Sequence, residues 1–315
     1  MSTPVLALGP QRPAPNLRDA LDAEGVTGPL ALITAGWRVD ELEIDALKRH
    51  AGVPILHLPL YAWFEALMAA DPALKRTYRQ RQDRILALKE LYRLRLLPAL
   101  AAVDDLRAHN RRHPDAPDLG VEELEDALRG LRTLDDRVVE GVARIRADVP
   151  TLERPWDHHP AVRARYDEIV DTLDRASALA IAGGHIGVLR NRMQLFGFSQ
   201  HLPRLLAQGQ PIVAWAGGVM TLTERVVIYY DDPPQGISEA EVFSPGFGLL
   251  PGVVLFPHAR RRLRLDDPDR LERLVARFHP RLCLGMENGA WMSWRGADWT
   301  DHSRPDTLLR LADLP

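Results

Sequence analysis

Short apolar runs alternate with amphipathic stretches near the start of the chain. Leu30-Ala31-Leu32-Ile33-Thr34 is the first strong run, and it ends at Gly36. An amphipathic stretch from about residue 40 to residue 50 follows, and Ile55-Leu56-His57-Leu58 is the second run. The order strand, helix, strand is typical of the beginning of a parallel α/β sheet.

The same alternation resumes after about residue 150. A predicted helix near 160–174 precedes the apolar run 178–182, which leads into Gly183-Gly184-His185. Residues 211–215 have the length and composition of another buried strand. Further predicted elements are strands at 226–230, 253–256 and 281–285 and a helix near 267–278.

The middle of the chain has helical spacing instead. Apolar side chains fall on one side of a predicted helix at Ile85, Leu88, Tyr92, Leu96, Leu100 and Val103. After a polar linker the spacing returns at Leu124, Leu128, Leu131, Leu134, Val138, Val142 and Ile145. Asp71 and Pro72 are typical of a helix start, and Pro98 is expected to kink or break the first helix. Two long helices joined by a polar loop predict an antiparallel hairpin.

These patterns divide the chain into three parts. Residues 1–26 are rich in proline and alanine, which indicates a loosely packed lead-in. Residues 27–60 and 151–315 form the predicted α/β domain with a mostly parallel sheet, and 61–150 form a helical arm inserted in it. The apolar stripe of the arm must be covered, either by the two helices on each other or by a partner. A protein partner or self-association through the arm is therefore one hypothesis for its use.

Composition narrows the classes of partner. The 315 residues include 40 Lys and Arg against 43 Asp and Glu, a net charge of -3, which gives no electrostatic reason to expect nucleic acid or an anionic membrane. No apolar stretch approaches the length of a membrane span. Cys283 is the single cysteine, so no internal disulfide can form and a reducing, cytoplasmic location is expected.

The segment Ala214-Trp215-Ala216-Gly217-Gly218 lies between a predicted buried strand and a predicted helix. This spacing is typical of a nucleophile elbow, in which small residues flank a central residue held in a strained turn. The central residue normally presents an oxygen or sulfur atom beside the positive end of a helix. Ala216 presents a methyl group, which cannot attack a carbonyl.

The segment resembles the Gly-Thr-Ser-Ala-Gly elbow of the cyanophycinase and dipeptidase E family of serine peptidases, with Ala216 in place of the serine. Gly183-Gly184 is similar to the family's turn that helps form the oxyanion site, and His185 and Gly217 adjoin these positions. Asp231 lies where the dipeptidase E branch has its acidic triad member. Residues 246–252 are similar to the family's Gly-Leu-Gly-Leu-Leu-Pro segment.

That segment leads into Phe256-Pro257-His258, where the family has its catalytic histidine, and Leu284-Gly285-Met286-Glu287 is similar to its late strand with an acidic residue. The resemblance covers about 175–292 well and 28–60 weakly. It implies a class I glutamine-amidotransferase-like three-layer α/β sandwich, and the helical arm is additional to the family's pattern.

The missing serine predicts a catalytically degenerate protein that keeps the pocket and binds a peptide or a small acidic ligand. No cofactor or metal is expected. The alternative is an active hydrolase of altered chemistry, in which Asp231, His258 or Glu287 activates water directly. Ser244 or Cys283 is the other conceivable replacement for the nucleophile.

Several of these residues also have structural interpretations. Asp231 precedes a natural surface turn, His258 is as well explained by a structural hydrogen bond, and Glu287 is explained as the end of a strand. Cys283 lies within an apolar run and is interpreted as an inert core thiol. The basic cluster at 260–264 could receive a carboxylate or phosphate or form a solvated face. A metal site built from residues 157–159 and 301–302 has no tight ligand spacing to support it.

Overall fold

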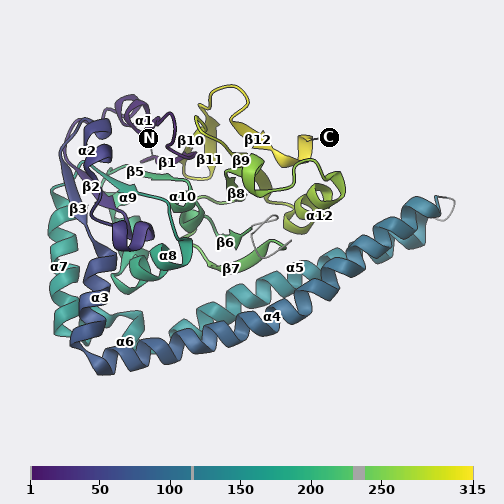
Figure 1. Ribbon diagram of the computed structural model, residues 1–315, viewed down its shortest axis with the longest axis horizontal. Coiled ribbons are helices and arrows are strands. Elements are labelled where there is room, and N and C mark those ends of the chain that lie inside the picture. The colour runs from purple at the N-terminus through teal and green to yellow at the C-terminus, as the bar shows by residue number, and fades with distance from the viewer. Residues whose placement is uncertain (1, 115–116, 230–237, 315) are drawn as a thin grey trace.

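The computed structural model describes residues 2–114, 117–229 and 238–314. Its central sheet has seven strands, and helices lie on both sides of it (Figure 1). The strand order is β11-β10-β1-β5-β4-β2-β3. The five strands from β1 to β3 in this order are parallel, and β10 and β11 are antiparallel. Their bounds are β1 Val5–Leu8, β2 Leu30–Ile33, β3 Ile55–Leu58, β4 Ala178–Ile181, β5 Ile212–Trp215, β10 Trp291–Arg295 and β11 Asp298–Asp301. The predicted α/β class with a mostly parallel sheet is confirmed.

Helices cover both faces of this sheet because alternate side chains of each strand point to opposite sides. Leu6 and Leu8 of β1 pack in one apolar cluster with α1 (Leu17–Ala23) and α2 (Asp45–Ala51). Val5 and Ala7 belong to the other cluster, with helices from the opposite layer. That layer contains α3 Leu60–Ala70, α7 Pro160–Asp174, α8 Ile186–Leu195, α9 Phe198–Ala207 and α10 Gly217–Leu222. The result is a three-layer sandwich.

Two smaller sheets extend the core beyond β10 and β11. The first pairs β8 and β9 in parallel and adds β12 antiparallel to β9, and the second is a β6-β7 ribbon. Their bounds are β6 Arg225–Ile228, β7 Glu241–Pro245, β8 Val253–Pro257, β9 Leu282–Met286 and β12 Leu308–Arg310. The helices α11 Ala259–Arg262 and α12 Pro268–Phe278 connect β8 to β9.

The N-terminal segment is not the loosely packed lead-in that its proline content suggests. β1 is an interior strand of the sheet, paired with β5 on one side and β10 on the other, and its four side chains are buried. Its prolines do not interrupt the ladder because Pro10, Pro13 and Pro15 all follow the strand. Burial of an apolar strand between two neighbours therefore outweighs the local composition.

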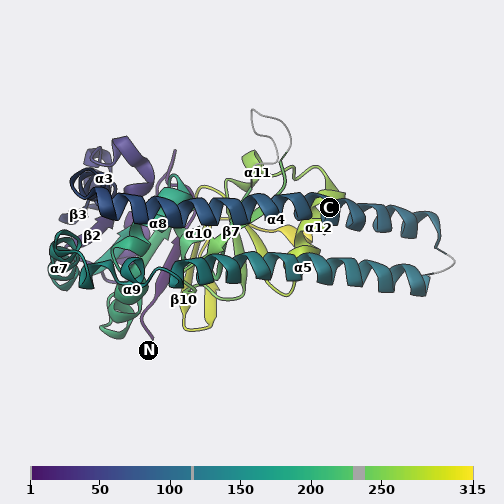
Figure 2. The same ribbon diagram turned by 90° about the horizontal axis from the view of Figure 1, so that it is seen from below.

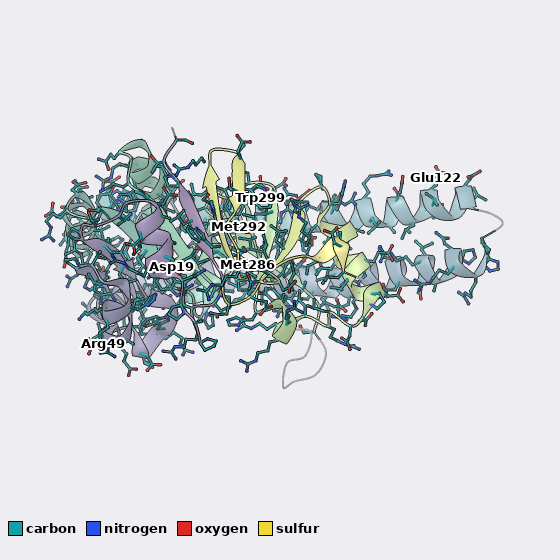
Figure 3. The ribbon with its side chains drawn as sticks, turned by 90° about the horizontal axis from the view of Figure 1, so that it is seen from above. Asp19, Arg49, Glu122, Met286, Met292 and Trp299 are labelled. Carbon is teal, nitrogen blue, oxygen red and sulfur yellow. The ribbon has the colours of Figure 1, made fainter. Side chains whose placement is uncertain are left out.

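The helical arm consists of α4 (Pro72–Arg112) and α5 (Pro117–Ala147), which run side by side in both views (Figures 1 and 2). The side chain of Asp71 caps α4 by accepting hydrogen bonds from the amides of Ala73 and Leu74. α4 is continuous through Pro98, so the predicted break does not occur. Packing against α5 along its length offsets the hydrogen bond that the proline removes. The far end of the arm, which includes Glu122, projects beyond the core (Figure 3).

A buried ion pair holds the arm against the core. The guanidinium of Arg277 on α12 donates two hydrogen bonds of 2.7 Å to the carboxylate of Asp135 on α5. It also donates to the Tyr92 hydroxyl of α4 at 2.8 Å, and that hydroxyl donates to Asp135 at 2.8 Å. Arg277 is 2% exposed and Asp135 is 1% exposed, so removal of either charge leaves the other buried without its counter-charge.

Among the described residues, every helix is too short or too polar to serve as a transmembrane span.

We predict that Asp135→Asn lowers the free energy of unfolding by about 3–5 kcal/mol, because it leaves the buried Arg277 guanidinium without its counter-charge. Urea denaturation measures this change. The adjacent Asp136→Asn is the matched control: Asp136 pairs with Arg225 at 2.8 Å but is 52% exposed, so its loss is expected to cost less than about 1 kcal/mol. Equal effects of the two substitutions would contradict the assignment of Asp135 as the anchor.

Candidate functional site

The turn between β5 and α10 has the geometry of the predicted elbow. Ala216 has φ 47° and ψ −126°, a region that residues with a side chain rarely occupy, and it directly precedes α10. Its amide donates to the carbonyl of Leu8, the last residue of β1, at 3.1 Å. Ala216 therefore sits at the carboxyl end of an interior strand in a strained conformation, with a methyl group at the point of the turn.

The Gly183-Gly184 turn, which follows the neighbouring strand β4, lies against this elbow. A Cβ atom on Gly183 would come within 2.7 Å of the Gly217 nitrogen and 2.9 Å of the Ala216 Cβ, and one on Gly218 would come within 2.5 Å of the Ile181 oxygen. Only glycine permits such an approach. The amides of Gly183, Gly184 and Gly217 donate to no acceptor among the described residues.

His258, which follows β8 of the three-stranded sheet, lies in the same cleft as Ala216. It adopts a left-handed conformation with φ 62° and ψ 38°, and donates its amide to the Met286 carbonyl at 2.9 Å. Burial lowers the pKa of the imidazole below 6.5, and the positive charges of Arg262 and Arg261 lower it further. The half-buried ring is consequently neutral near pH 7 and able to accept a proton.

Glu287 follows β9, the neighbour of β8. Its carboxylate accepts a hydrogen bond of 2.7 Å from the amide of Arg260, at the start of the short helix α11. This hydrogen bond fixes the backbone of the segment that follows His258. Glu287 is not among the described residues that line the cleft below.

Ala216, Gly183, Gly184 and His258 line one cleft of about 640 Å³. The structure therefore brings these four predicted site residues together, although they come from three separate strand ends. The other walls are formed by the N-terminal segment and by the region between β2 and β3. These residues are Pro10, Gln11, Arg12, Pro13, Pro15, Gly36, Trp37, Asp40, Glu43, Ala46, Leu47 and His50, and Trp215 at the end of β5 completes the lining.

Other candidates lie elsewhere. His185 caps α8 through its Nδ1 and lines a second cavity, together with Ser244, so neither side chain is part of the cleft wall. Cys283 is buried in β9, and burial raises the pKa of its thiol to about 12, which makes it an inert core residue as interpreted from the sequence. Gly217 packs behind the elbow against Gly184. Asp231 lies outside the described residues.

The N-terminal wall of the cleft was not expected from the sequence. Residues 9–16 are held in place by Asn288, whose side-chain amide donates to the carbonyls of Pro10 at 2.6 Å and Ala14 at 2.9 Å. The available signal was the apolar run Val5-Leu6-Ala7-Leu8 ending at Gly9, a strand-to-glycine pattern like that of β2, β4 and β5. This run was not predicted as a strand because the proline content of residues 1–26 indicated a loosely packed segment.

The described residues include no group of three or more His, Cys, Asp or Glu side chains arranged to hold a metal ion.

We predict that Ala216→Gly leaves the free energy of unfolding unchanged or raises it by up to about 1 kcal/mol, because glycine relieves the positive φ at this turn. Ala214→Gly, two residues earlier in β5, is the matched control and is expected to lose more than about 1 kcal/mol, because it removes a buried methyl from a regular strand. Thermal or urea unfolding measures both. Similar losses for the two variants would show that Ala216 carries no backbone strain.

The chain has only limited sequence similarity to known proteins. No known protein-family profile matches the chain. It is 29% identical over 79 residues to the pyridoxal 5'-phosphate synthase subunit PdxT of Geobacillus sp. (strain WCH70), a match that spans 25% of this chain and 41% of that relative.

Two solved structures are similar over nearly the whole chain. One is a peptidase from an acI-B1 Actinobacterium, with a TM-score of 0.48, 13% identity and coverage of 98% of this chain and 94% of that one. The other is a putative peptidase E protein from Listeria monocytogenes EGD-e, with a TM-score of 0.48, 8% identity and coverage of 96% and 100%. The α/β sandwich itself is established by the strand order and the two apolar layers of this chain.

Proposed function

We propose that this chain is a catalytically degenerate relative of the cyanophycinase and dipeptidase E peptidases, on a class I glutamine-amidotransferase-like fold, and that it binds rather than cleaves its ligand. The observation that carries the proposal is the Ala216 methyl at the point of a strained strand-to-helix turn, in the same cleft as His258. Covalent acyl transfer requires a side-chain nucleophile at that point. A methyl group supplies none.

The rest of the cleft supports ligand binding. The amides of Gly183 and Gly184, which line the cleft and have no acceptor among the described residues, lie beside the elbow as donors for a carbonyl or carboxylate oxygen. Arg12 lines the cleft and is exposed, which provides a cation for an acidic group. Asp40 and Glu43 lie on another part of the wall and suit an amine. A peptide or a small acidic compound fits this distribution of charge.

We predict that wild-type protein does not hydrolyse α-aspartyl or β-aspartyl dipeptides and is not labelled by a fluorophosphonate, whereas Ala216→Ser gains labelling and measurable hydrolysis. The reason is that the substitution places a hydroxyl at the elbow, in the same cleft as the His258 imidazole, whose lowered pKa makes it a base near pH 7. Peptide hydrolysis and mass spectrometry of the labelled protein measure the two effects. Ala214→Ser, whose hydroxyl would be buried in β5, is the matched control and is expected to remain unlabelled.

Two outcomes would overturn the proposal. Labelling of the wild-type protein at residues 214–218 would show a nucleophile at the elbow. Hydrolysis by wild type that disappears in His258→Ala would instead support the alternative, an active hydrolase in which the imidazole activates water. The half-buried His258 imidazole in the cleft, with its pKa lowered by burial and by Arg262 and Arg261, favours this alternative.

A second role, protein interaction through the arm, is favoured by one feature of α4. Leu86, Leu91, Leu94 and Leu97 are between 59% and 68% exposed although they lie on a packed helix. Exposed apolar patches of this kind mark interaction surfaces. The occupant would be a second copy of this chain or another protein.

We predict that Leu94→Gln combined with Leu97→Gln abolishes the association of the arm without unfolding the core, because the substitutions remove exposed apolar area only. Light scattering after gel filtration measures the mass of wild type and variant. Val39→Gln together with Leu42→Gln, which removes comparably exposed apolar residues outside the arm, is the control. If the wild-type protein is monomeric and binds no partner protein, the proposed interaction through the arm is wrong.

A further inference from the structure

A second cavity lies where the helical arm meets the α/β core, and it is distinct from the elbow cleft. Its volume is about 190 Å³, room for roughly six water molecules at about 30 Å³ each. Side chains from α4, the end of α5, the start of α8 and β7 surround it. Its polar and aromatic lining includes Gln82, Lys89, Arg146, Asn191, Arg192 and Phe243.

Three of these side chains are cations, and no Asp or Glu is among the described residues that line the cavity. Lys89 is 8% exposed, and its ammonium lies 3.0 Å from the centroid of the Phe243 ring. The Arg192 side chain is 12% exposed, and its Nε has no hydrogen-bond partner in the described part of the chain. Burial of cations without matching acceptors is costly, and it is normally offset by a counter-ion.

The nearby carboxylates offset the charge of these cations only in part, and the Glu241 charge raises the pKa of Lys89 less than burial lowers it. Glu65 pairs with Arg192 at 3.2 Å but is 52% exposed, and Glu241 is paired with Arg93 at 2.7 Å. Arg146 forms no ion pair with any described residue. The local charge is therefore positive even though the whole chain carries a net charge of -3.

The titration of the two cations from the arm agrees with this description. Burial lowers the pKa of Lys89 to about 7, and the charges of Arg146 and Arg93 add to the effect. Burial likewise lowers the pKa of Arg146 to about 10, with a further contribution from Arg81. Each cation is thus destabilised by its surroundings, and an anion placed between them would reverse that effect.

Neutral donors complete the lining. The side-chain amides of Gln82 and Asn191 lie on opposite elements, α4 and α8. Gly187, in the first turn of the ten-residue helix α8, also lines the cavity, and the positive end of that helix favours an anion. A doubly charged group with several oxygen acceptors matches this set of donors better than a single carboxylate does.

We propose that this cavity is a binding site for a small phosphoryl-bearing anion, held by Lys89, Arg146 and Arg192 between the arm and the core. The site is independent of the function proposed for the elbow cleft, because the two share no lining residue. Because the three cations come from α4, α5 and α8, an anion bound by all of them would link the arm to α8 of the core.

Inorganic phosphate is the probe that tests the proposal. Wild-type protein is expected to show a rise in melting temperature with phosphate, relative to chloride at equal ionic strength, and saturable heat in calorimetry. Arg146→Gln and Lys89→Gln are expected to weaken phosphate binding by about tenfold or more, because each removes a charge-assisted contact. Arg144→Gln, which removes an exposed arginine from the same helix, is the matched control and is expected to bind as wild type does.

The melting temperature without phosphate is a second readout. Arg146→Gln and Lys89→Gln are expected to melt at or above wild type in chloride, because each removes a buried or half-buried positive charge that lies near other positive charges. The proposal is overturned if wild type shows no phosphate-specific stabilisation, or if the Arg144→Gln control loses binding to the same extent as the two cavity variants.

Discussion

The buried ion pair between Arg277 and Asp135 determines how the two halves of this structure meet. An unpaired charge at this depth would cost several kcal/mol, so α5 can only lie where its carboxylate reaches the α12 guanidinium. Tyr92 extends the same constraint to α4 and, through the amide of Val242, to β7. The long hairpin is consequently docked on the core near its middle, while its far end projects (Figure 2).

The docking of the arm has a chemical consequence. Lys89 lies about one turn before Tyr92 on α4, and Arg146 lies towards the end of α5, so fixing the hairpin also fixes these cations opposite α8. The core supplies Arg192 from the facing helix. Like charges would separate if the helices were free to move, and they stay together because the ion pair and the apolar stripe hold the hairpin in place.

The elbow cleft depends on a different constraint, the close approach of backbone segments at the ends of parallel strands. Gly183 and Gly218 allow the turns after β4 and β5 to contact each other, and this contact leaves Ala216 in its strained conformation. The strain is therefore a property of the strand ends and does not require a hydroxyl at residue 216. His258 reaches the same cleft because β8 ends beside β9. The Met286 carbonyl of β9 accepts a hydrogen bond from the His258 amide.

The sequence by itself determined the elements whose signals are local. Apolar runs ending in glycine identified β2, β4 and β5, the helical spacing of apolar residues identified the hairpin, and small residues around Ala216 identified the elbow, because each signal lies within one continuous segment. Only the tertiary structure decided that β1 lies inside the sheet, that Arg12 lines the cleft and that Glu287 caps α11. The same is true of the cavity around Lys89 and Arg146. These features arise from strand order and helix docking, which bring together residues distant in the chain, and no local pattern records such non-local contacts.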